Sequence, residues 1–591
     1  MTSQHLWFPS GNHTLLAHLN VPAQPVRHGV VIVPPFGWED ICAYRPLRSL
    51  AAGLASKGIA TLRFDLPGTG DSSGSPLDRR LLAAWAQSVQ NAVSELKKNT
   101  GLQKVSIFGV RMGALLALAA APGSNVDGLI LWGASATGRV LLRELRAFRN
   151  LEVSDYAEGE MPPPAPVEGL EVAGFLLSPE TEKEIEVFNV DQLPPLPGQR
   201  VLLLSRDSFP HDKKLVQSLE KAGCQITLKT GAGYQDMLAA PHEPVEFSAD
   251  TEREIVEFID GSYAGNPLSD ASRASSERNR SWSEGGLVET ALTLSYNSRS
   301  IFSILARPSV PPASDWGLLF MNAGGVRHIG PNRMWVEAAR RWATRGIPSM
   351  RFDFQPVGES DGDELATLDN LHDNSLVEQL DVVMSAMRKQ MNCRRFIAVG
   401  LCSGAFASFQ ALLVDPSIRH ALMLNPRVFF WDPEIESRRL AQRVNKGLGD
   451  VSYWRRLVCG EIEPQRIQQA ARIALTRLLH GGVLNARIQQ IPRHAMASSW
   501  DRIKRLQTRV TLVFADGEPL RQEMIDEKQL PPSNNPLIKS IHVGKTGHTF
   551  RALWAQQLVQ DLIDSEVALT IQEEFSQCRP EEVLHGLPAL V

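Results

Sequence analysis

Cys402 stands in a sequence context that could expose a thiol for nucleophilic chemistry. It is the middle residue of a Gly-x-Cys-x-Gly pattern at residues 400–404, after an apolar run and before a run of small residues. This order predicts a strand, a sharp turn and a helix. Small residues are needed on both sides of the tip because the strand and the helix nearly touch there. Ser403 is a poorer tip, since its frame would put Leu401 at a crowded position. We therefore predict that Cys402 is a nucleophile.

Two further residues could complete a catalytic group with this cysteine. Asp516 follows the apolar run 510–514, and His548 lies in a glycine-containing turn after the strand-like run 538–543. A histidine can act as the general base toward a thiol, and a carboxylate can fix the tautomer of that histidine. His542 falls inside the predicted strand, so we expect it to be a packed or surface residue.

A Cys-His-Asp group of this kind would attack the carbonyl carbon of an ester or a thioester and hold the acyl group as a covalent thioester. An imidazolium beside the thiol, together with the N-terminus of the following helix, would favour the thiolate at neutral pH. We expect the oxyanion to be bound by the backbone N–H of Ser403 and by one from Gly324 or Gly325. The acyl group could then pass to water or to another acceptor. The alternatives are an inert packed Cys402 and an ordinary glycine turn.

The elements that must position these residues occur twice in the chain. Six of twelve positions are identical between residues 63–74 and residues 351–362, and residues 108–113 correspond to residues 399–404. Each copy alternates apolar strand-like runs with helical stretches. This alternation indicates βαβ units on a mostly parallel sheet that is covered by helices on both faces. The sequence therefore predicts a duplicated α/β domain.

The two copies set the predicted domain boundaries. Domain one is expected at residues 1–262 and domain two at residues 285–591, since 591 residues are too many for one hydrophobic core. Residues 263–284 between them are rich in Ser, Arg and Glu, and such a composition cannot bury much apolar surface. We predict that this segment is a linker.

The turn at Cys402, the later Asp516 and the last His548 follow one another in the order found in the α/β-hydrolase superfamily, which the chain resembles over both domains. The cysteine replaces the usual serine, which resembles dienelactone hydrolases, polyhydroxyalkanoate synthases and the acyl-shuttling transferases of nonribosomal peptide clusters. The tandem layout loosely resembles proteins found with bacterial polysaccharide and secondary-metabolite biosynthesis. The resemblance implies an acyl-transfer enzyme, either a thioesterase, an esterase or an acyltransferase, in a biosynthetic pathway.

Domain one has lost the chemistry in this comparison. Arg111 stands at the tip of its turn and cannot act as a nucleophile, although Asp207 follows a late strand as the acid would. Gln235 falls on the position of the histidine, and His242 is expected to be a loop residue. We predict that domain one is catalytically inactive and packs on or regulates domain two. Arg111 could bind a carboxylate or phosphate group, or it could be a satisfied surface arginine.

An insertion at about residues 429–505 lies where α/β-hydrolases carry a lid. It contains an apolar helical stripe, which comprises Ile467, Ala470, Ala471, Ala474, Leu475 and Leu478. The many arginines near this stripe could guide a carrier protein or the phosphate of coenzyme A. Alternatively, they are the solvated face of helices.

Charge and composition argue against other classes of function. The net charge is −4 and the pI about 6.4, so no nucleic-acid partner is expected. No cysteine pair has CxxC spacing and no glycine motif has the GxGxxG context, so we predict no metal, nucleotide or flavin cofactor. Neither a membrane-spanning apolar stretch nor a signal peptide is evident, so a cytoplasmic protein is predicted. The competing hypothesis is a non-catalytic binding or assembly protein in which both domains are degenerate.

Overall fold

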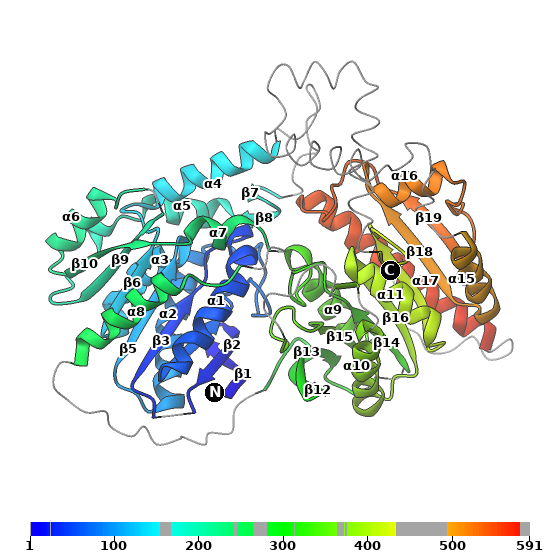
Figure 1. Cartoon of the computed structure of the whole chain (residues 1–591), viewed down its shortest axis with the longest axis horizontal. Helices are drawn as coiled ribbons and strands as arrows, with labels where there is room; N and C mark the ends of the chain where they lie inside the picture. Colours follow the sequence, from blue (N-terminus) through cyan, green and yellow to red (C-terminus); the bar gives the residue numbers. More distant parts are fainter. Residues whose placement is uncertain are drawn as a thin grey trace, which may run out of the picture.

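The computed structural model describes most of the chain as two α/β domains that lie side by side, each built on one large sheet (Figure 1). The described residues are 2–23, 25–153, 167–207, 209–241, 245–263, 280–312, 314–362, 371–372, 375–432 and 493–578. The predicted fold class is confirmed: both sheets are mostly parallel and both carry helices on their two faces.

The sheet of the first domain has eight strands in the order β1-β2-β4-β3-β5-β6-β9-β10. The pairings β1–β2 and β2–β4 are antiparallel and the others are parallel. All residues of the four central strands β3 to β6 are buried, as expected for strands covered on both faces. The strands are β1 (Thr2–Ser10), β2 (His13–Val21), β3 (His28–Val33), β4 (Ile59–Phe64), β5 (Val105–Val110), β6 (Gly128–Trp132), β9 (Arg200–Arg206) and β10 (Gln225–Gly231).

Alternate residues of these strands contribute to two apolar cores. Val31 and Val33 pack in the core that contains α2 and α3, whereas Val30 and Ile32 pack with α1 and α8. The helices are α1 (Trp38–Ser56), α2 (Leu81–Thr100), α3 (Met112–Ser124), α4 (Gly138–Val153), α5 (Pro179–Val187), α6 (Lys213–Lys221), α7 (Tyr234–Ala239) and α8 (Ala249–Asp260). A separate two-stranded hairpin consists of β7 (Leu170–Val172) and β8 (Phe175–Leu177).

The second domain repeats this strand order and adds one strand at the edge, giving β11-β12-β13-β15-β14-β16-β17-β18-β19. The pairings from β11 to β15 are antiparallel and the others are parallel. The strands are β11 (Ser281–Glu284), β12 (Leu287–Tyr296), β13 (Arg299–Pro308), β14 (Trp316–Phe320), β15 (Ser349–Phe352), β16 (Arg395–Leu401), β17 (Ile418–Leu424), β18 (Arg509–Phe514) and β19 (Ile538–His542).

Strand β11 extends the second domain into the predicted linker. It pairs with β12, and Gly285 and Gly286 turn the chain between the two strands with φ angles of 55° and 83°. The predicted linker therefore extended too far, to residue 284. The short strand is mostly polar, so the sequence did not indicate that Trp282 is buried. Residues 264–279 of the predicted linker lie outside the described residues.

The helices of the second domain cover both faces of its sheet (Figure 1). They are α9 (Met334–Thr344), α10 (Ser375–Met391), α11 (Ser403–Val414), α15 (Arg493–Leu506), α16 (Pro519–Asp526) and α17 (Leu553–Cys578). Residues 433–492 of the predicted lid lie outside the described residues, as do its apolar stripe and arginines. Residues 493–505 belong to α15, and Met496 and Ile503 of this helix pack in the same core as α11. This end of the predicted lid is therefore part of the domain core.

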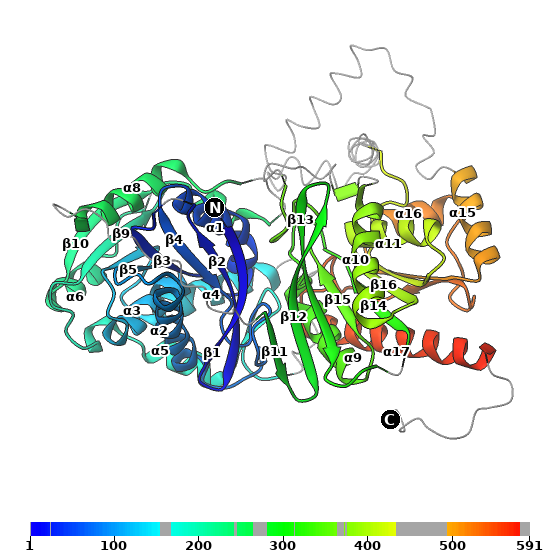
Figure 2. The same cartoon turned by 90° about the horizontal axis from the view of Figure 1, so that it is seen from below.

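The two domains meet along the β1–β2 hairpin of the first and strands β11 to β13 of the second (Figure 2). The ring centroids of Trp7 and Trp282 are 5.6 Å apart, and those of His5 and Phe302 are 4.3 Å apart. Trp7 is buried in one continuous apolar cluster with residues of the second domain. The contact therefore buries large apolar side chains, as a stable interface does.

The repeated motif found in the sequence lies at this interface. Arg63 and Arg351 are equivalent in the two copies, and so are Asp71 and Glu359. Each arginine pairs with the acid of the other copy, at 2.8 Å from Arg63 to Glu359 and 2.8 Å from Arg351 to Asp71. All four side chains are buried. The two copies of the motif therefore form two reciprocal ion pairs between the domains.

His328 connects the two domains at the centre of this charged cluster. Its Nε2 lies 2.6 Å from Asp71 of the first domain and its Nδ1 lies 2.8 Å from Asp353 of the second. Burial lowers the pKa of this imidazole, but the carboxylates of Asp353 and Asp71 outweigh burial and raise the pKa to about 9. The imidazole is therefore cationic at neutral pH and binds one aspartate from each domain.

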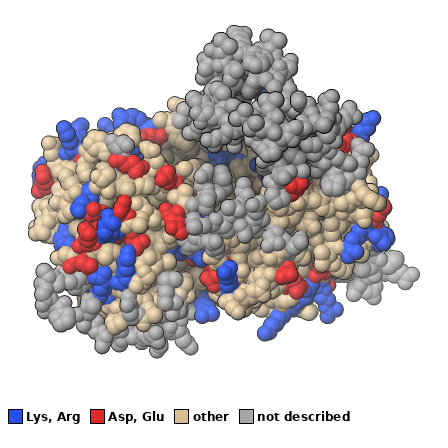
Figure 3. Space-filling model, in the orientation of Figure 1, with Lys and Arg blue, Asp and Glu red and all other residues tan. Residues whose placement is uncertain are grey.

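On the face drawn in Figure 3, acidic and basic side chains are interspersed over the described residues. Charges of one sign do not gather there into a large patch, in keeping with the near-neutral composition. Among the helices that the structure describes, none has the length and apolar character needed to cross a lipid bilayer.

Candidate active site

Cys402 is the tip of a sharp turn between β16 and α11. Its backbone angles are φ 57° and ψ −112°, a conformation that non-glycine residues rarely adopt. A Cβ atom on Gly400 would lie 2.2 Å from the carbonyl carbon of Gly404, and one on Gly404 would lie 2.4 Å from the carbonyl oxygen of Asn322. Only glycine fits at these two positions, so the spacing expected from the sequence has a steric cause. The side chain of Cys402 is partly exposed.

Ser403 begins α11 and does not occupy the tip. Its side chain is buried, and its hydroxyl oxygen accepts a hydrogen bond from the N–H of Gly324 at 3.0 Å. The N–H of Gly324 is therefore engaged and does not point to the thiol as an oxyanion donor, contrary to the expectation. Gly325 lies in the same turn, which an antiparallel bridge between Ala323 and Val326 closes. The backbone N–H of Ser403, at the N-terminus of α11, stays the candidate donor.

His548 lies beside the thiol and is held by a buried carboxylate. Its side chain interacts with that of Cys402, and its Nδ1 lies 2.8 Å from Oε1 of Glu518. Burial lowers the pKa of His548, but the contacts with Cys402 and Glu518 outweigh burial and raise the pKa to about 9. The imidazole thus interacts with the sulfur and is held on its other side by a buried carboxylate.

The carboxylate of this chain belongs to Glu518 and not to Asp516, so the expected pairing of Asp516 with His548 is wrong. Asp516 lies 2.6 Å from Nε2 of His542, and its side chain is 46% exposed, against 5% for Glu518. The chain turns at Gly517, where φ is 77°. This turn leaves Asp516 at the surface and carries Glu518 inward.

The sequence contained a signal for Glu518. This residue is the N-cap of α16, directly before Pro519, the first residue of that helix. Proline favours the first position of a helix. A search for the helix start would therefore have drawn attention to an acid two residues beyond the one that directly follows the strand.

Asn425 joins the acid loop to the histidine loop and was missed by sequence reasoning. Its Oδ1 accepts a hydrogen bond from the N–H of Ala515 at 2.7 Å. Its Nδ2 donates to the carbonyl oxygens of His548 at 2.7 Å and Gly547 at 3.3 Å. Asn425 is completely buried and follows β17 with a φ of 41°. A polar residue at the end of a buried strand is the only sequence signal for this role.

The corresponding turn of the first domain carries Arg111 with nearly the same backbone angles, φ 55° and ψ −113°. The guanidinium is buried and pairs with two carboxylates of its own domain, those of Glu39 at 3.0 Å and Glu144. The charge of Arg111 is thus satisfied inside the domain. The predicted binding site for an external anion is therefore not formed by this arginine.

The other two triad positions of the first domain have structural roles. Asp207 accepts hydrogen bonds from the backbone N–H groups of Gly233 at 2.9 Å and Gln235 at 2.8 Å, at the start of α7. Gln235, which the sequence places opposite the histidine of the second domain, lies in α7. His242 lies outside the described residues. The former acid therefore caps a helix instead of holding a base.

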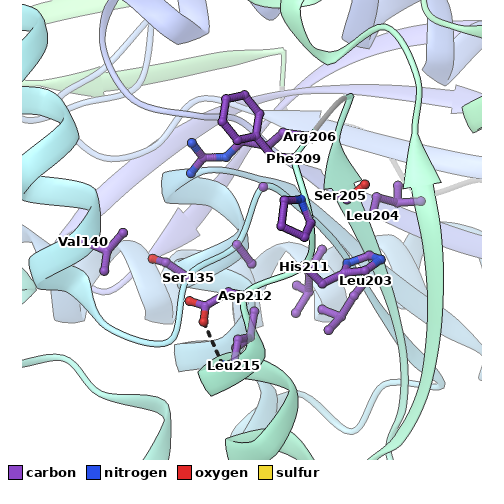
Figure 4. Close-up of a pocket in the computed structure, with 14 residues that line it drawn as sticks. Ser135, Val140, Leu203, Leu204, Ser205, Arg206, Phe209, His211, Asp212 and Leu215 are labelled. Atoms are coloured by element: carbon purple, nitrogen blue, oxygen red, sulfur yellow. Dashed lines mark hydrogen bonds between the residues drawn. The ribbon is translucent and has the colours of Figure 1, made fainter.

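A cavity of about 180 Å³ lies in the first domain at the ends of β6 and β9 (Figure 4). Its polar lining includes His211 and Asp212, but Arg111 does not line it. The carboxylate of Asp212 accepts hydrogen bonds from the backbone N–H groups of Ala136 and Leu215 at 3.1 and 3.3 Å. The acid in this cavity is therefore used to cap a helix.

His5, His18 and Glu359 bring together three donor atoms of the kind that bind metals, all within 4.8 Å of one another. The two imidazole Nδ1 atoms lie 2.8 Å apart, as in a hydrogen bond. Burial lowers the pKa of His5 to about 4, so this ring is neutral. The carboxylate, however, already binds the guanidinium of Arg63, and this positive charge opposes a second cation. The three side chains contact one another as part of the interface, where Nε2 of His18 is buried without a hydrogen-bond partner.

Comparison with known proteins agrees with this architecture. Residues 30–252 match the alpha/beta hydrolase family, so the match falls on the first domain. Similar solved structures include DcsB in complex with its substrate analogue (17% identity, 45% of this chain and 100% of that chain, TM-score 0.32). Others are the alpha/beta hydrolase GrgF from Penicillium sp. sh18 (17%, 45% and 99%, 0.32) and ferulic acid-bound Est1E from Butyrivibrio proteoclasticus (16%, 43% and 99%, 0.30). No curated protein matches the chain. Because the family match covers the first domain and the second repeats its strand order, both domains have the α/β-hydrolase fold.

Proposed function

We propose that the second domain is an acyl-transfer enzyme in which Cys402 is the nucleophile, His548 the general base and Glu518 the residue that orients the base. One observation carries this proposal: the imidazole that interacts with the thiol at the strained tip is held through its Nδ1 by a buried carboxylate. A nucleophile, a base and a group that orients the base are the requirements for covalent acyl transfer. Cysteine at the tip favours ester and thioester substrates.

The reaction proceeds in two halves. The thiolate of Cys402 attacks the carbonyl carbon of the substrate, and the backbone N–H of Ser403 stabilises the negative oxygen of the tetrahedral intermediate. The imidazolium of His548 then gives its proton to the leaving alcohol or thiol, and the acyl group stays on sulfur as a thioester. In the second half His548 takes a proton from water or another acceptor, which attacks the thioester and restores the thiolate.

Hydrolysis and transfer differ only in the acceptor of this second half. A thioester exchanges with another thioester at little cost in free energy, so a thiol or an amine can compete with water. We propose that the donor is an ester or thioester, including one carried on coenzyme A or a carrier protein, and that the reaction belongs to a biosynthetic pathway. Added thiols or amines that divert the product from the free acid would identify a transferase.

The test is detection of an acyl group on Cys402. The whole chain is mixed with p-nitrophenyl acetate or an acetyl thioester, and intact mass is recorded together with release of the leaving group. The unaltered protein is expected to gain one acetyl group, and Cys402→Ala to lose both the adduct and the turnover. Cys224→Ala, in the first domain, is the control and should behave as the unaltered protein. Full turnover in Cys402→Ala would reject Cys402 as the nucleophile. An unaltered protein that is inert toward both esters would favour a non-catalytic binding protein instead.

A further inference from the structure

The β7–β8 hairpin of the first domain reaches the segment that directly follows His548. The carboxylate of Glu171, in β7, accepts a hydrogen bond from the backbone N–H of Leu553 at 2.8 Å. Leu553 is the first residue of α17, whose first N–H groups have no partner within the helix. An acid of the first domain therefore caps the helix that begins five residues after His548, and a negative charge is favourable there.

The tip of the same hairpin presses against this segment. Ala173 and Gly174 form the tip with φ angles of 50° and 78°. A Cβ atom on Gly174 would lie only 1.8 Å from the carbonyl oxygen of Arg551, so the two backbones are in direct contact. Nε2 of Gln556 donates to the carbonyl oxygen of Gly174 at 2.7 Å. The hairpin thus holds residues 551–556 from the side of the first domain.

The second domain holds the other end of the histidine loop. Asn425 binds the carbonyl oxygens of Gly547 and His548. Between the two anchors lies Phe550, which is completely buried and has a φ of 53°. A strained residue of this kind persists only where its surroundings fix it. Asn425 of the second domain holds the loop before Phe550, and the β7–β8 hairpin of the first domain holds the segment after it.

We propose that the catalytically inactive first domain positions the general base of the second through the β7–β8 hairpin, with Glu171 and Gly174 as positioning residues. This inference rests on the proposed function of His548. Catalysis needs the base within hydrogen-bond distance of the sulfur, and a misplacement of about 1 Å can cost about a hundredfold in rate. The first domain therefore acts on the reaction without touching the substrate.

Gly174→Ala is the sharpest test, because its methyl group would collide with the carbonyl oxygen of Arg551. Gly198→Ala is the matched control: Gly198 has a similar φ of 73°, but a Cβ atom there would meet no atom within 4 Å. Both variants carry the same backbone strain, and only one pushes the hairpin from the histidine loop. Their difference therefore isolates the contact between the domains.

The readout is the rate at which iodoacetamide alkylates Cys402 at pH 6 and at pH 9.5, measured by mass spectrometry of the peptide that contains it. A general base in contact with the sulfur accelerates its alkylation, so the unaltered protein should react at pH 6. Gly174→Ala is expected to lower the rate at pH 6 at least about tenfold and to leave the rate at pH 9.5 nearly unchanged. Gly198→Ala should match the unaltered protein at both pH values.

Two outcomes separate the inference from the proposed function. An unaltered protein that reacts at pH 9.5 but not at pH 6 would show that His548 does not activate the thiol, which overturns the proposed function. Reaction at pH 6 in both the unaltered protein and a folded Gly174→Ala variant would overturn the positioning role alone. If Gly174→Ala does not fold, Glu171→Ala decides: it should show the same loss at pH 6, and Glu171→Gln, which keeps an acceptor oxygen, should restore part of the rate.

Discussion

The turns at Cys402 and Arg111 have the same backbone and opposite chemistry. Their φ and ψ angles agree within a few degrees, and both are flanked by glycines at which a Cβ atom would collide with backbone. The strained turn is therefore present in the first domain without a nucleophile at its tip. Close packing of strand against helix, which glycine makes possible, is sufficient to hold it. A strained backbone at a sheet edge is thus evidence of the fold, and the side chain at the tip decides whether the site can react.

The residues of the first domain at the positions compared with the triad make structural contacts. The arginine at the tip is neutralised by Glu39 and Glu144, and Asp207 caps α7. In the second domain the equivalent loops converge on His548, and Asn425 ties them together. The same loops therefore serve stability in one domain and an aligned set of side chains in the other. The four predictions that follow test this contrast.

The largest effect is expected for the acid of the second domain. Glu518→Gln should lower kcat/KM on an activated ester by about 10³- to 10⁴-fold, because a neutral amide no longer stabilises the imidazolium or its correct tautomer. Asp516→Asn should change kcat/KM by less than about twofold, since its carboxylate faces the surface beside His542. Both variants replace a carboxylate by an amide, and only Gly517 separates the two positions. Equal losses in both would show that the loop rearranges when substrate binds.

The next largest effect is expected for the reciprocal ion pairs between the two copies of the motif. Arg351→Met should lower the free energy of unfolding by about 3–5 kcal/mol, because it leaves Asp71 and Glu289 buried with less compensating charge. The control is Arg146→Met, which breaks the half-exposed pair of Arg146 with Glu182 and should cost at most about 1 kcal/mol. Urea denaturation measures both. A loss of similar size in the two variants would argue that the interface pairs contribute no more than surface pairs.

The pH dependence of stability should also reflect the interface. The pKa of His328 is raised in the folded protein from 6.5 to about 9, so its contribution is complete below about pH 6.5 and is lost as the pH rises toward 9. His548 has a pKa raised to about 9 and contributes with the same sign.

Two other buried histidines have lowered pKa values, and they affect the pH dependence of stability in the opposite direction. Burial lowers the pKa of His28 and of His420 to about 3, so their contribution is present above pH 6.5 and is lost as the pH falls. The free energy of unfolding, measured by urea denaturation from pH 5 to pH 9.5, should therefore pass through a maximum near pH 6.5 and fall by about a few kcal/mol on the alkaline side. His548→Gln should keep most of that alkaline fall. A flat alkaline side in the unaltered protein would contradict a cationic His328.

The smallest effect on activity is expected at the tip of the first domain. Arg111→Met should lower the free energy of unfolding by about 2 kcal/mol, because Glu39 and Glu144 lose a buried partner. Turnover by the second domain should stay the same at temperatures where the variant is folded. Esterase assays and thermal melts on the same preparation separate the two effects. A selective loss of turnover would give Arg111 a part in the reaction that its contacts do not suggest.

The fold followed from the sequence because its signals are local and repeated. Apolar runs of strand length, the motif at residues 63–74 that returns at residues 351–362, and the glycines around Cys402 depend on steric and burial requirements that each residue carries with it. These predicted two α/β domains, each with a mostly parallel sheet, and a cysteine at the tip of a turn. The edge strand β11 was not predicted, because its four mostly polar residues do not show the apolar alternation of a strand.

What only the tertiary structure decided concerns side chains that meet across long distances in the chain. The sequence favoured Asp516, which directly follows the apolar run. In the structure the chain turns at Gly517 with a positive φ, and Glu518 contacts the histidine. The pairing of each copy's arginine with the other's acid depends on how two finished domains dock. Electrostatic and hydrogen-bond partners are fixed by distance and direction in space, whereas the sequence specifies only the spacing along the backbone.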